Sequence, residues 1–304
     1  MTQFDFYLNN LSFKKPEALI IPELQERIKQ FVGDCEFIRQ QNSERIFRHY
    51  SIYDELIFDN CTVSDFCHTP LGIELTDRDS QVYLQQIIDH AKDTNLENED
   101  IIELLDEHDE ELINGILCLH KIQNINEIYC VYHKNDWLRF HRYFLCEYPP
   151  VRNEFCKNLS PYFPNLYFNE ASIPAGLNGL HTNYTEIMQT IIHHLSALND
   201  VFFDIFMQEG MSGDEACDEL ENHYRSHQVG IRASRDKNGL KELDFEFSDS
   251  DKKLYCDLHT KFHQYFEYKT PSYEAKGNRI YFHQPINAFK DGKVLIARIG
   301  KHAN

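Results

Sequence analysis

The hydrophobic pattern of the chain changes its period near residue 225. Before that point, apolar residues recur three and four positions apart, as on one face of an amphipathic helix, most clearly at about 22–35, 79–92 and 184–198. Beyond it, short runs rich in β-branched and aromatic residues alternate with turn residues, which is typical of neighbouring antiparallel strands. The sequence therefore predicts an α+β protein, mainly helical at first and closed by an antiparallel β-meander at its C-terminus.

Five strands are expected in this meander. Their sequences are VGIRAS, LKELDFEF, KLYCDLHTKF, NRIYFHQ and KVLIARI. Further upstream, Pro149-Pro150 interrupts the chain and predicts a division into two parts. We expect an acidic, α-rich domain over residues 1–150, in which ILCLHKI and EIYCVYHK form a possible hairpin, and helices plus the antiparallel sheet over residues 151–304.

Charge is also unevenly distributed along the chain. The net charge is −19, yet residues 225–304 contain 15 Lys and Arg against 10 Asp and Glu, a net charge of +5. Residues 1–224 therefore carry a net charge of −24. One interpretation is that the acidic region regulates the basic region or binds a protein partner. The other is that acidic helices only keep the chain in solution.

Several classes of protein are disfavoured. No run approaches the ~18 apolar residues that a membrane span requires, and the start MTQFDFYLNN lacks the pattern of a secretory signal. The nine cysteines are scattered and form no Cys-x-x-Cys pair, which fits reduced thiols in a cytoplasmic protein. Gly-rich phosphate loops and Gly-x-Ser-x-Gly are absent. We therefore predict a cytoplasmic protein with no cofactor, no metal and no membrane contact.

Polar side chains that could carry chemistry follow the last strands. Because side chains alternate between the two faces of a strand, neighbouring strands would gather these residues on one cationic face. The predicted catalytic residues are His259, Lys261, Arg279, Tyr281 and His283. The predicted substrate-binding residues are His263, Arg298 and Lys301, of which Arg298 alternates with the apolar Val294 and Ile296 and would lie at the edge of the face.

Such a face suits a phosphodiester substrate. Arg and Lys bind phosphate and stabilise the charge that develops on it, while His and Tyr transfer protons. Metal-free cleavage of RNA needs a base for the 2′-hydroxyl, an acid for the leaving oxygen and a cation between them. The alternative is that this is an ordinary solvated face of a sheet, on which Lys, Arg and His are common.

The order Asp-Leu-His-x-Lys, Asn-Arg-Ile-Tyr-Phe and Val-Leu-Ile-x-x-Ile-Gly-Lys-His, over about residues 254–302, resembles the end of RelE/HigB-type ribonuclease toxins. The resemblance implies a domain of helices followed by an antiparallel sheet, which cleaves mRNA, often on the ribosome. It implies catalytic roles for Arg279, Tyr281 and Lys301, and also for His259 and Lys261. This chain has His259 where those toxins usually have Arg.

We therefore expect an RNA-directed, metal-independent, toxin-like endoribonuclease or antiviral defence effector, whose acidic N-terminal region regulates it. Its partners would be RNA or the ribosome, together with a protein partner for the acidic region. The alternative is a non-catalytic nucleic-acid- or protein-binding subunit of a bacterial defence or stress complex. A third interpretation is a metal-dependent hydrolase.

Overall fold

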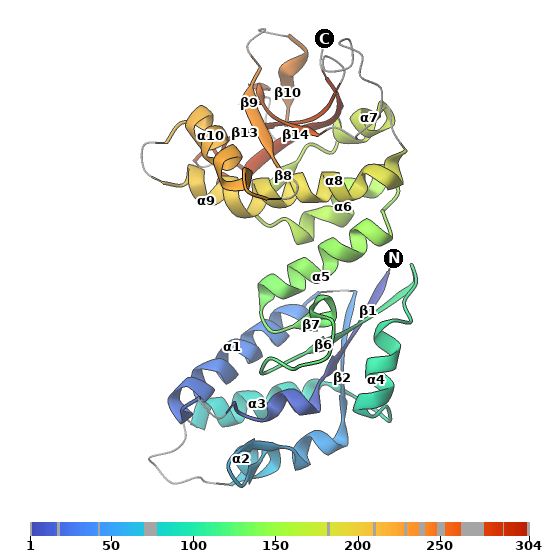
Figure 1. Ribbon diagram of the computed structural model, residues 1–304, viewed down its shortest axis with the longest axis vertical. Helices are drawn as coiled ribbons and strands as arrows, with labels where there is room; N and C mark the ends of the chain where they lie inside the picture. Colours follow the sequence, from blue (N-terminus) through green and yellow to red (C-terminus); the bar gives the residue numbers. More distant parts are fainter. Residues whose placement is uncertain are drawn as a thin grey trace. The chain divides into compact units, whose positions relative to one another are not determined.

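The computed structural model describes most of the chain, and the chain divides into two compact units (Figure 1). Unit 1 is Met1–Tyr143 and unit 2 is Phe144–Asn304. The described residues are 2–16, 19–41, 43–69, 78–180, 183–208, 211–227, 230–236, 241–247, 253–262, 277–287 and 289–302. Each unit has a five-stranded sheet of its own.

Unit 1 is built on a parallel sheet of strand order β5-β2-β1-β6-β7. These strands are β1 (Gln3–Leu8), β2 (Glu44–His49), β5 (Lys92–Thr94), β6 (Leu112–Leu117) and β7 (Cys130–Val131). The helices are α1 (Ile21–Arg39), α2 (Val63–His68), α3 (Arg78–His90), α4 (Asn98–Leu105) and α5 (Lys134–Glu147), and β3 (Leu56–Phe58) pairs with β4 (Cys61–Thr62). Because the chain moves outward from β1 to one edge and then returns to the other side of β1, the sheet is doubly wound.

The central strands of unit 1 are buried on both faces, so their sequences lack the alternation of a half-exposed strand. On one face, the ring of Phe6 packs against Phe140 of α5 with centroids 5.1 Å apart. A Cβ added at Gly115 would lie 2.7 Å from the Phe6 ring, so this position needs glycine for close packing. On the other face, the Asn114 amide donates to the carbonyl oxygen of Leu104 in α4 at 3.2 Å.

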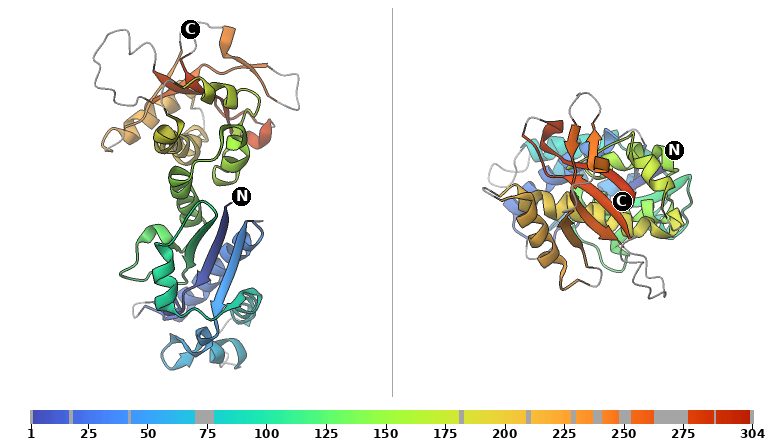
Figure 2. Two further views of the ribbon diagram at one scale, coloured as in Figure 1. Left: turned by 90° about the vertical axis from the view of Figure 1, so that its right-hand side faces the viewer. Right: turned by 90° about the horizontal axis from the view of Figure 1, so that it is seen from above.

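Unit 2 is built on a mixed sheet of strand order β8-β14-β13-β12-β9. The strands are β8 (Leu166–Phe168), β9 (Arg232–Arg235), β12 (Leu258–Phe262), β13 (Asn278–His283) and β14 (Val294–Lys301). The β8–β14 pair is parallel and the other pairs are antiparallel. A separate antiparallel pair joins β10 (Asp244–Glu246) and β11 (Lys253–Tyr255). Figure 2 shows the last strands in orange and red beside the helices of the same unit.

The helices of unit 2 are α6 (Phe155–Leu159), α7 (Ile173–Asn178), α8 (Tyr184–Ser196), a π-helical segment (Ala197–Phe202), α9 (Phe203–Phe206) and α10 (Gly213–Tyr224). They bury one face of the sheet, where Ile191 of α8 belongs to the same apolar cluster as Ile280 and Phe282. The other face has a second apolar cluster, which contains Phe245 and Leu254 of the β10–β11 pair. The sheet of unit 2 is therefore covered on both faces.

The periodicity located the long helices well. The helices expected at about 22–35, 79–92 and 184–198 are α1, α3 and α8. Asn183 caps α8 by accepting a hydrogen bond from the Thr185 N–H at 3.3 Å. Among the described helices, none combines the length and the apolarity that crossing a membrane requires.

The predicted fold class is wrong. Helices and strands are interspersed throughout, unit 1 has a parallel sheet, and unit 2 has a mixed sheet in place of an antiparallel meander. The expected hairpin is also wrong, because β6 and β7 run parallel with Ile116 opposite Cys130. Parallel pairing joins segments that are distant in sequence, and local patterns do not report it.

One predicted strand is in fact two. The segment KLYCDLHTKF breaks at Cys256 and Asp257, so β11 pairs with β10 while β12 pairs with β9 and β13. Cys256 is fully buried in the second apolar cluster. Asp257 forms an ion pair with Arg235 at 2.6 Å, which fixes the chain where it passes from one sheet to the other.

Candidate functional site

The strand pairing of unit 2 places four of the predicted site residues on one face of its sheet. β12 runs antiparallel to β13, with His259 opposite Tyr281 and Lys261 opposite Arg279. Directly opposed residues of an antiparallel pair point to the same side of the sheet. The ring centroids of His259 and Tyr281 are 5.6 Å apart. We refer to His259, Lys261, Arg279 and Tyr281 as the polar cluster.

A β-bulge brings Arg298 to this face as well. The alternation of side chains along β14 predicted that Arg298 points to the same side of the sheet as the apolar Val294 and Ile296. In the structure the pairing of β13 with β14 shifts, so that Phe282 is opposite Ile296 but Tyr281 is opposite Arg298. The extra residue between Ile296 and Arg298 reverses the alternation from that point on. Arg298 therefore lies beside Tyr281, where local alternation did not place it.

Two residues near the polar cluster were missed. Ser234 of β9 lies opposite His259, and its Oγ is 3.4 Å from His259 Nε2. His302 follows β14, and its Nδ1 is 3.0 Å from the hydroxyl oxygen of Tyr281. The alternation within VGIRAS could have identified Ser234 once the pairing of β9 with β12 was known. No local pattern indicated His302, because it lies beyond the end of its strand.

The remaining predicted residues lie elsewhere or outside the described part. His283 is opposite Leu295, and its Nδ1 is 2.7 Å from the carbonyl oxygen of Gln284, the next residue along the chain. Lys301 is half-buried at the end of β14, opposite Asn278. His263 falls outside the described residues. The structure therefore brings together only part of the predicted set.

Three of the four residues of the polar cluster are buried and Lys261 is half-buried, so this is not an ordinary solvated face. The exposed fractions are 3% for His259, 7% for Arg279 and 0% for Tyr281. The cover is the second apolar cluster, in which Tyr281 packs with side chains of the β10–β11 pair such as Phe245. Polar groups with proton-transfer chemistry therefore lie beneath an apolar layer.

Burial changes the protonation of His259. It lowers the pKa of this imidazole to about 4, and the positive charges of Arg279 and Lys261 act in the same direction. His259 is consequently neutral at neutral pH. A neutral imidazole can accept a proton, which is the property that a general base requires.

Arg279 is a buried cation with unused hydrogen-bonding capacity. Its Nε and Nη1 atoms are buried and have no hydrogen-bond partner in the part of the chain that the structure describes. No acidic side chain of the described residues lies within ion-pair distance of it. Buried charges in proteins are normally paired, so these two nitrogen atoms make Arg279 a candidate for binding an anion.

The arrangement combines a cation, a neutral imidazole and a tyrosine–histidine pair. Arg279 can bind an anionic oxygen, His259 can accept a proton, and Tyr281 with His302 can pass one on. Within the described ranges, no three His, Cys, Asp or Glu side chains are grouped so as to hold a metal ion. The chemistry that these residues support is anion binding with proton transfer.

Comparison with known protein families, with curated proteins and with solved structures finds no match for this chain. The resemblance of residues 254–302 to ribonuclease toxins therefore stays a prediction that rests on the quoted residues.

Proposed function

We propose that unit 2 binds a phosphate of RNA at Arg279 and cleaves the adjoining phosphodiester bond without a metal ion. The observation that carries this proposal is the buried, unpaired guanidinium of Arg279 beside a neutral imidazole. A guanidinium in a water-poor site stabilises phosphate charge far more than one in bulk water.

The proposed step uses each residue once. His259 accepts the proton of the ribose 2′-hydroxyl, whose oxygen then attacks the phosphorus. The bond from phosphorus to the 5′-oxygen breaks, and the Tyr281 hydroxyl, bonded to His302, gives its proton to that oxygen. Arg279 neutralises the non-bridging oxygens. The products are a 2′,3′-cyclic phosphate and a free 5′-hydroxyl, with no oxidant or hydrolytic water consumed.

A second candidate is a site that binds its anion without cutting. The observation that favours it is the complete burial of Tyr281 and the near-complete burial of His259, since an acid and a base must touch the substrate. In that case unit 2 is part of a nucleic-acid- or protein-binding subunit. Localisation in the cytoplasm, the ribosome as a partner and a role in defence are expectations that belong to the same proposal.

The decisive experiment uses the full chain and end-labelled single-stranded RNA in the presence of EDTA. Under the leading proposal, wild-type protein yields fragments that end in cyclic phosphate. His259→Gln and Arg279→Gln each slow cleavage by about 100-fold or more, whereas Lys253→Ala, an exposed position on β11, leaves it unchanged. RNA binding without cleavage by wild-type protein supports the second candidate, and absence of both excludes an RNA-directed role.

The acidic N-terminal region is proposed to restrain this activity. Unit 1 contains 13 Lys and Arg against 27 Asp and Glu, a net charge of −14, whereas residues 225–304 carry +5. The acidic unit 1 would therefore compete with RNA for the basic residues. Unit 2 alone, expressed as residues 144–304, should then bind or cleave RNA more strongly than the full chain. Equal activity of the two proteins would remove the regulatory role.

A further inference from the structure

Unit 1 has the topology in which ligands commonly bind at one edge of the sheet. β1 and β6 are neighbours, and the chain leaves β1 toward β2 on one side and leaves β6 toward β7 on the other. In open parallel sheets, the loops that diverge at the carboxyl ends of such strands leave a crevice between them. The residues of interest are therefore those that follow β1, β6 and β7.

The loops after β1 and β6 are joined by two hydrogen bonds to Ser12, one to its side chain and one to its backbone. The Ser12 hydroxyl oxygen accepts a hydrogen bond from the Leu119 N–H at 3.1 Å. The Ser12 carbonyl oxygen accepts one from the His120 N–H at 3.0 Å. His120 is consequently held in a fixed position, only 8% exposed, at the carboxyl edge of the sheet.

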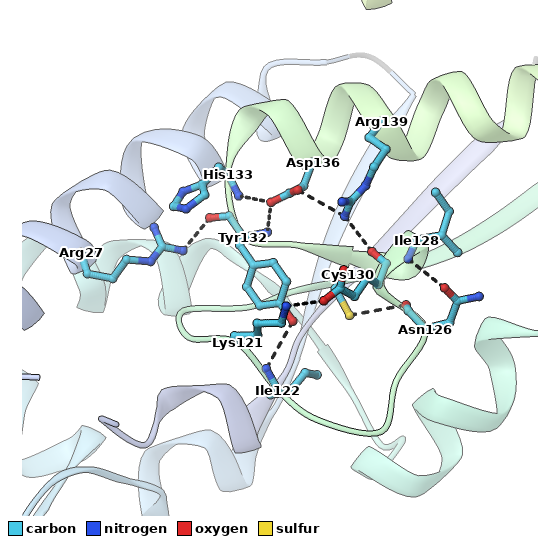
Figure 3. A network of polar contacts seen from close by, with 11 residues as sticks. Arg27, Lys121, Ile122, Asn126, Ile128, Cys130, Tyr132, His133, Asp136 and Arg139 are labelled. Atoms are coloured by element: carbon cyan, nitrogen blue, oxygen red, sulfur yellow. Dashed lines mark hydrogen bonds and ion pairs between the residues drawn. The ribbon is translucent and has the colours of Figure 1, made fainter. Parts of the chain in front are cut away.

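Arg27 of α1 connects the loops after β6 and β7. Its Nε donates to the Leu119 carbonyl oxygen at 2.7 Å, and its Nη2 donates to the carbonyl oxygens of Cys118 at 3.1 Å and Tyr132 at 2.5 Å. Figure 3 shows the contact with Tyr132 within the surrounding polar network. Three neutral carbonyl groups therefore hold the guanidinium, and they do not neutralise its charge.

A pocket of about 320 Å³ opens at this place. Arg27 and His120 both line it, together with Lys121, Tyr132, Asp136 and Arg139. This volume lies at the lower end of the range for sites that bind small molecules. The pocket is therefore large enough for a small metabolite and too small for a folded partner.

Two residues that line the pocket each have a buried nitrogen atom with unused hydrogen-bonding capacity. Arg27 Nη1 and His120 Nε2 are buried, and neither has a partner among the described residues. Burial, with Arg27 and Lys15 acting in the same direction, lowers the pKa of His120 to about 4, so its ring is neutral at neutral pH. A neutral ring beside a cation can donate a hydrogen bond through Nε2 without adding charge.

The acidic residues at the rim are already paired. Glu127 forms an ion pair with Lys121, and Asp136 forms one with Arg139 at 3.2 Å. Asp136, in the first turn of α5, also accepts hydrogen bonds from the N–H groups of Tyr132 and His133, which precede this helix (Figure 3). Arg27 is held by carbonyl groups, and the carboxylates of Asp34 and Asp136 offset part of its charge. Two further basic side chains, Lys121 and Arg139, stand at the rim in these ion pairs.

We propose that this pocket is a binding site for a small phosphate-bearing molecule, whose phosphate oxygens accept hydrogen bonds from Arg27 Nη1 and His120 Nε2. A phosphate monoester suits the pocket better than a monocarboxylate does. Its second negative charge can attract Lys121 and Arg139, whose partly exposed ion pairs with Glu127 and Asp136 are weak enough to exchange partners. This site lies in unit 1 and is independent of the proposed action of unit 2 on RNA.

The test is isothermal titration calorimetry on the full chain at constant ionic strength, with inorganic phosphate and a nucleoside 5′-monophosphate as probes and acetate as the comparison. We expect phosphate and the monophosphate to bind, and acetate to bind at least about tenfold more weakly. Equal binding of acetate, or no binding of any probe, would overturn the proposal.

Two variants locate the site. His120→Phe keeps an aromatic ring but removes Nε2, and it should raise the Kd for phosphate about tenfold or more. Arg139→Ala changes only a side chain at the rim of the pocket, so the protein should stay folded even if His120→Phe does not. This variant should raise the Kd for phosphate severalfold. Lys29→Ala, on the same helix as Arg27 but outside the pocket, is the control. Unchanged phosphate binding in both test variants would contradict the proposal.

Discussion

Units 1 and 2 both bury polar side chains beside a sheet, but they do so in different places. Unit 1 gathers them at the carboxyl edge of a parallel sheet, around Arg27 and His120. Unit 2 gathers them on one face of a mixed sheet, around His259 and Arg279, beneath an apolar layer. Parallel strands all end at the same edge, whereas antiparallel strands align alternate residues across a face. Strand direction therefore decides where each unit can assemble a site.

The difference also concerns how each buried arginine is held. Arg27 donates three hydrogen bonds to backbone carbonyl oxygens. Arg279 has two nitrogen atoms without partners among the described residues. The carbonyl contacts of Arg27 stabilise the fold and leave only Nη1 for a ligand, whereas the two partnerless nitrogen atoms of Arg279 lower stability and are explained better by a function. The following predictions test this contrast, from the largest expected effect to the smallest.

The largest effect is expected from close backbone contact in unit 2. A Cβ at Gly300 would lie 2.7 Å from the Gly176 carbonyl oxygen, and neither backbone can move without disturbing β14 or α7. Gly300→Ala should lower the free energy of unfolding by more than about 3 kcal/mol. Gly115→Ala in unit 1 should cost about 1–3 kcal/mol, because the Phe6 ring can rotate away.

Chemical denaturation measures both effects. Trp137 is the only tryptophan and is buried in unit 1, so its fluorescence follows that unit, and hydrogen exchange of β13 and β14 follows unit 2. Gly33→Ala is the control, since among the described residues no atom beyond its chain neighbours and the backbone of its own helix lies within 4 Å of the added Cβ. It should stabilise α1 by about 0.5–1 kcal/mol. A larger loss from Gly115→Ala than from Gly300→Ala would reverse the comparison.

Both units should lose stability in acid. The pKa of His120 and of His259 is lowered by burial from 6.5 to about 4. The unfolded chain therefore takes up these protons first as the pH falls. Above pH 6.5 both histidines are neutral in the folded and the unfolded chain, and the free energy of unfolding does not change with their protonation. Between pH 6.5 and about 4, each should lower the free energy of unfolding by about 3 kcal/mol.

Equilibrium unfolding at several pH values measures this loss. His120→Gln should flatten the pH dependence of unit 1 alone, and His259→Gln that of unit 2 alone. Exposed His90 provides the control, because its replacement by Gln leaves both slopes unchanged. An unaltered slope in either test variant would show that its histidine is not buried as a neutral ring.

Replacing the two arginines by methionine contrasts their roles directly. Arg27→Met leaves three carbonyl groups without their donor and should destabilise unit 1 by about 2 kcal/mol. Arg279→Met removes an unpaired buried charge and should leave the stability of unit 2 unchanged or raised. A loss of stability in Arg279→Met as large as that in Arg27→Met would mean that Arg279 serves the fold.

Helix caps should give the smallest effect and show no contrast between the units. Ser212 begins α10 in a capping box with Glu215, and Thr62 begins α2 in the same way with Asp65. Ser212→Ala and Thr62→Ala should each cost about 1 kcal/mol. Exposed Ser226 provides a neutral control. If only one of the two variants lowers the free energy of unfolding, the helix of the other unit is stabilised by packing and not by its cap.

The polar cluster of unit 2 could be predicted only in part, because alternation works within a strand and fails at its irregularities. The pairing of His259 with Tyr281 and of Lys261 with Arg279 follows the alternation of two regular strands. Arg298 follows a β-bulge, which reverses the alternation, and His302 lies beyond the end of its strand, where side chains no longer alternate. The pocket of unit 1 had no local signal, because Arg27, His120 and Arg139 come from separate elements.

By itself, the sequence determined the long helices α1, α3 and α8, since a helix needs only an apolar face and suitable ends. It also determined the separation of acidic from basic residues. Only the tertiary structure decided that β6 and β7 run parallel, that KLYCDLHTKF divides between two sheets, and that most of the polar cluster is buried. These features depend on contacts between residues far apart in the chain, whose free energy no local pattern contains.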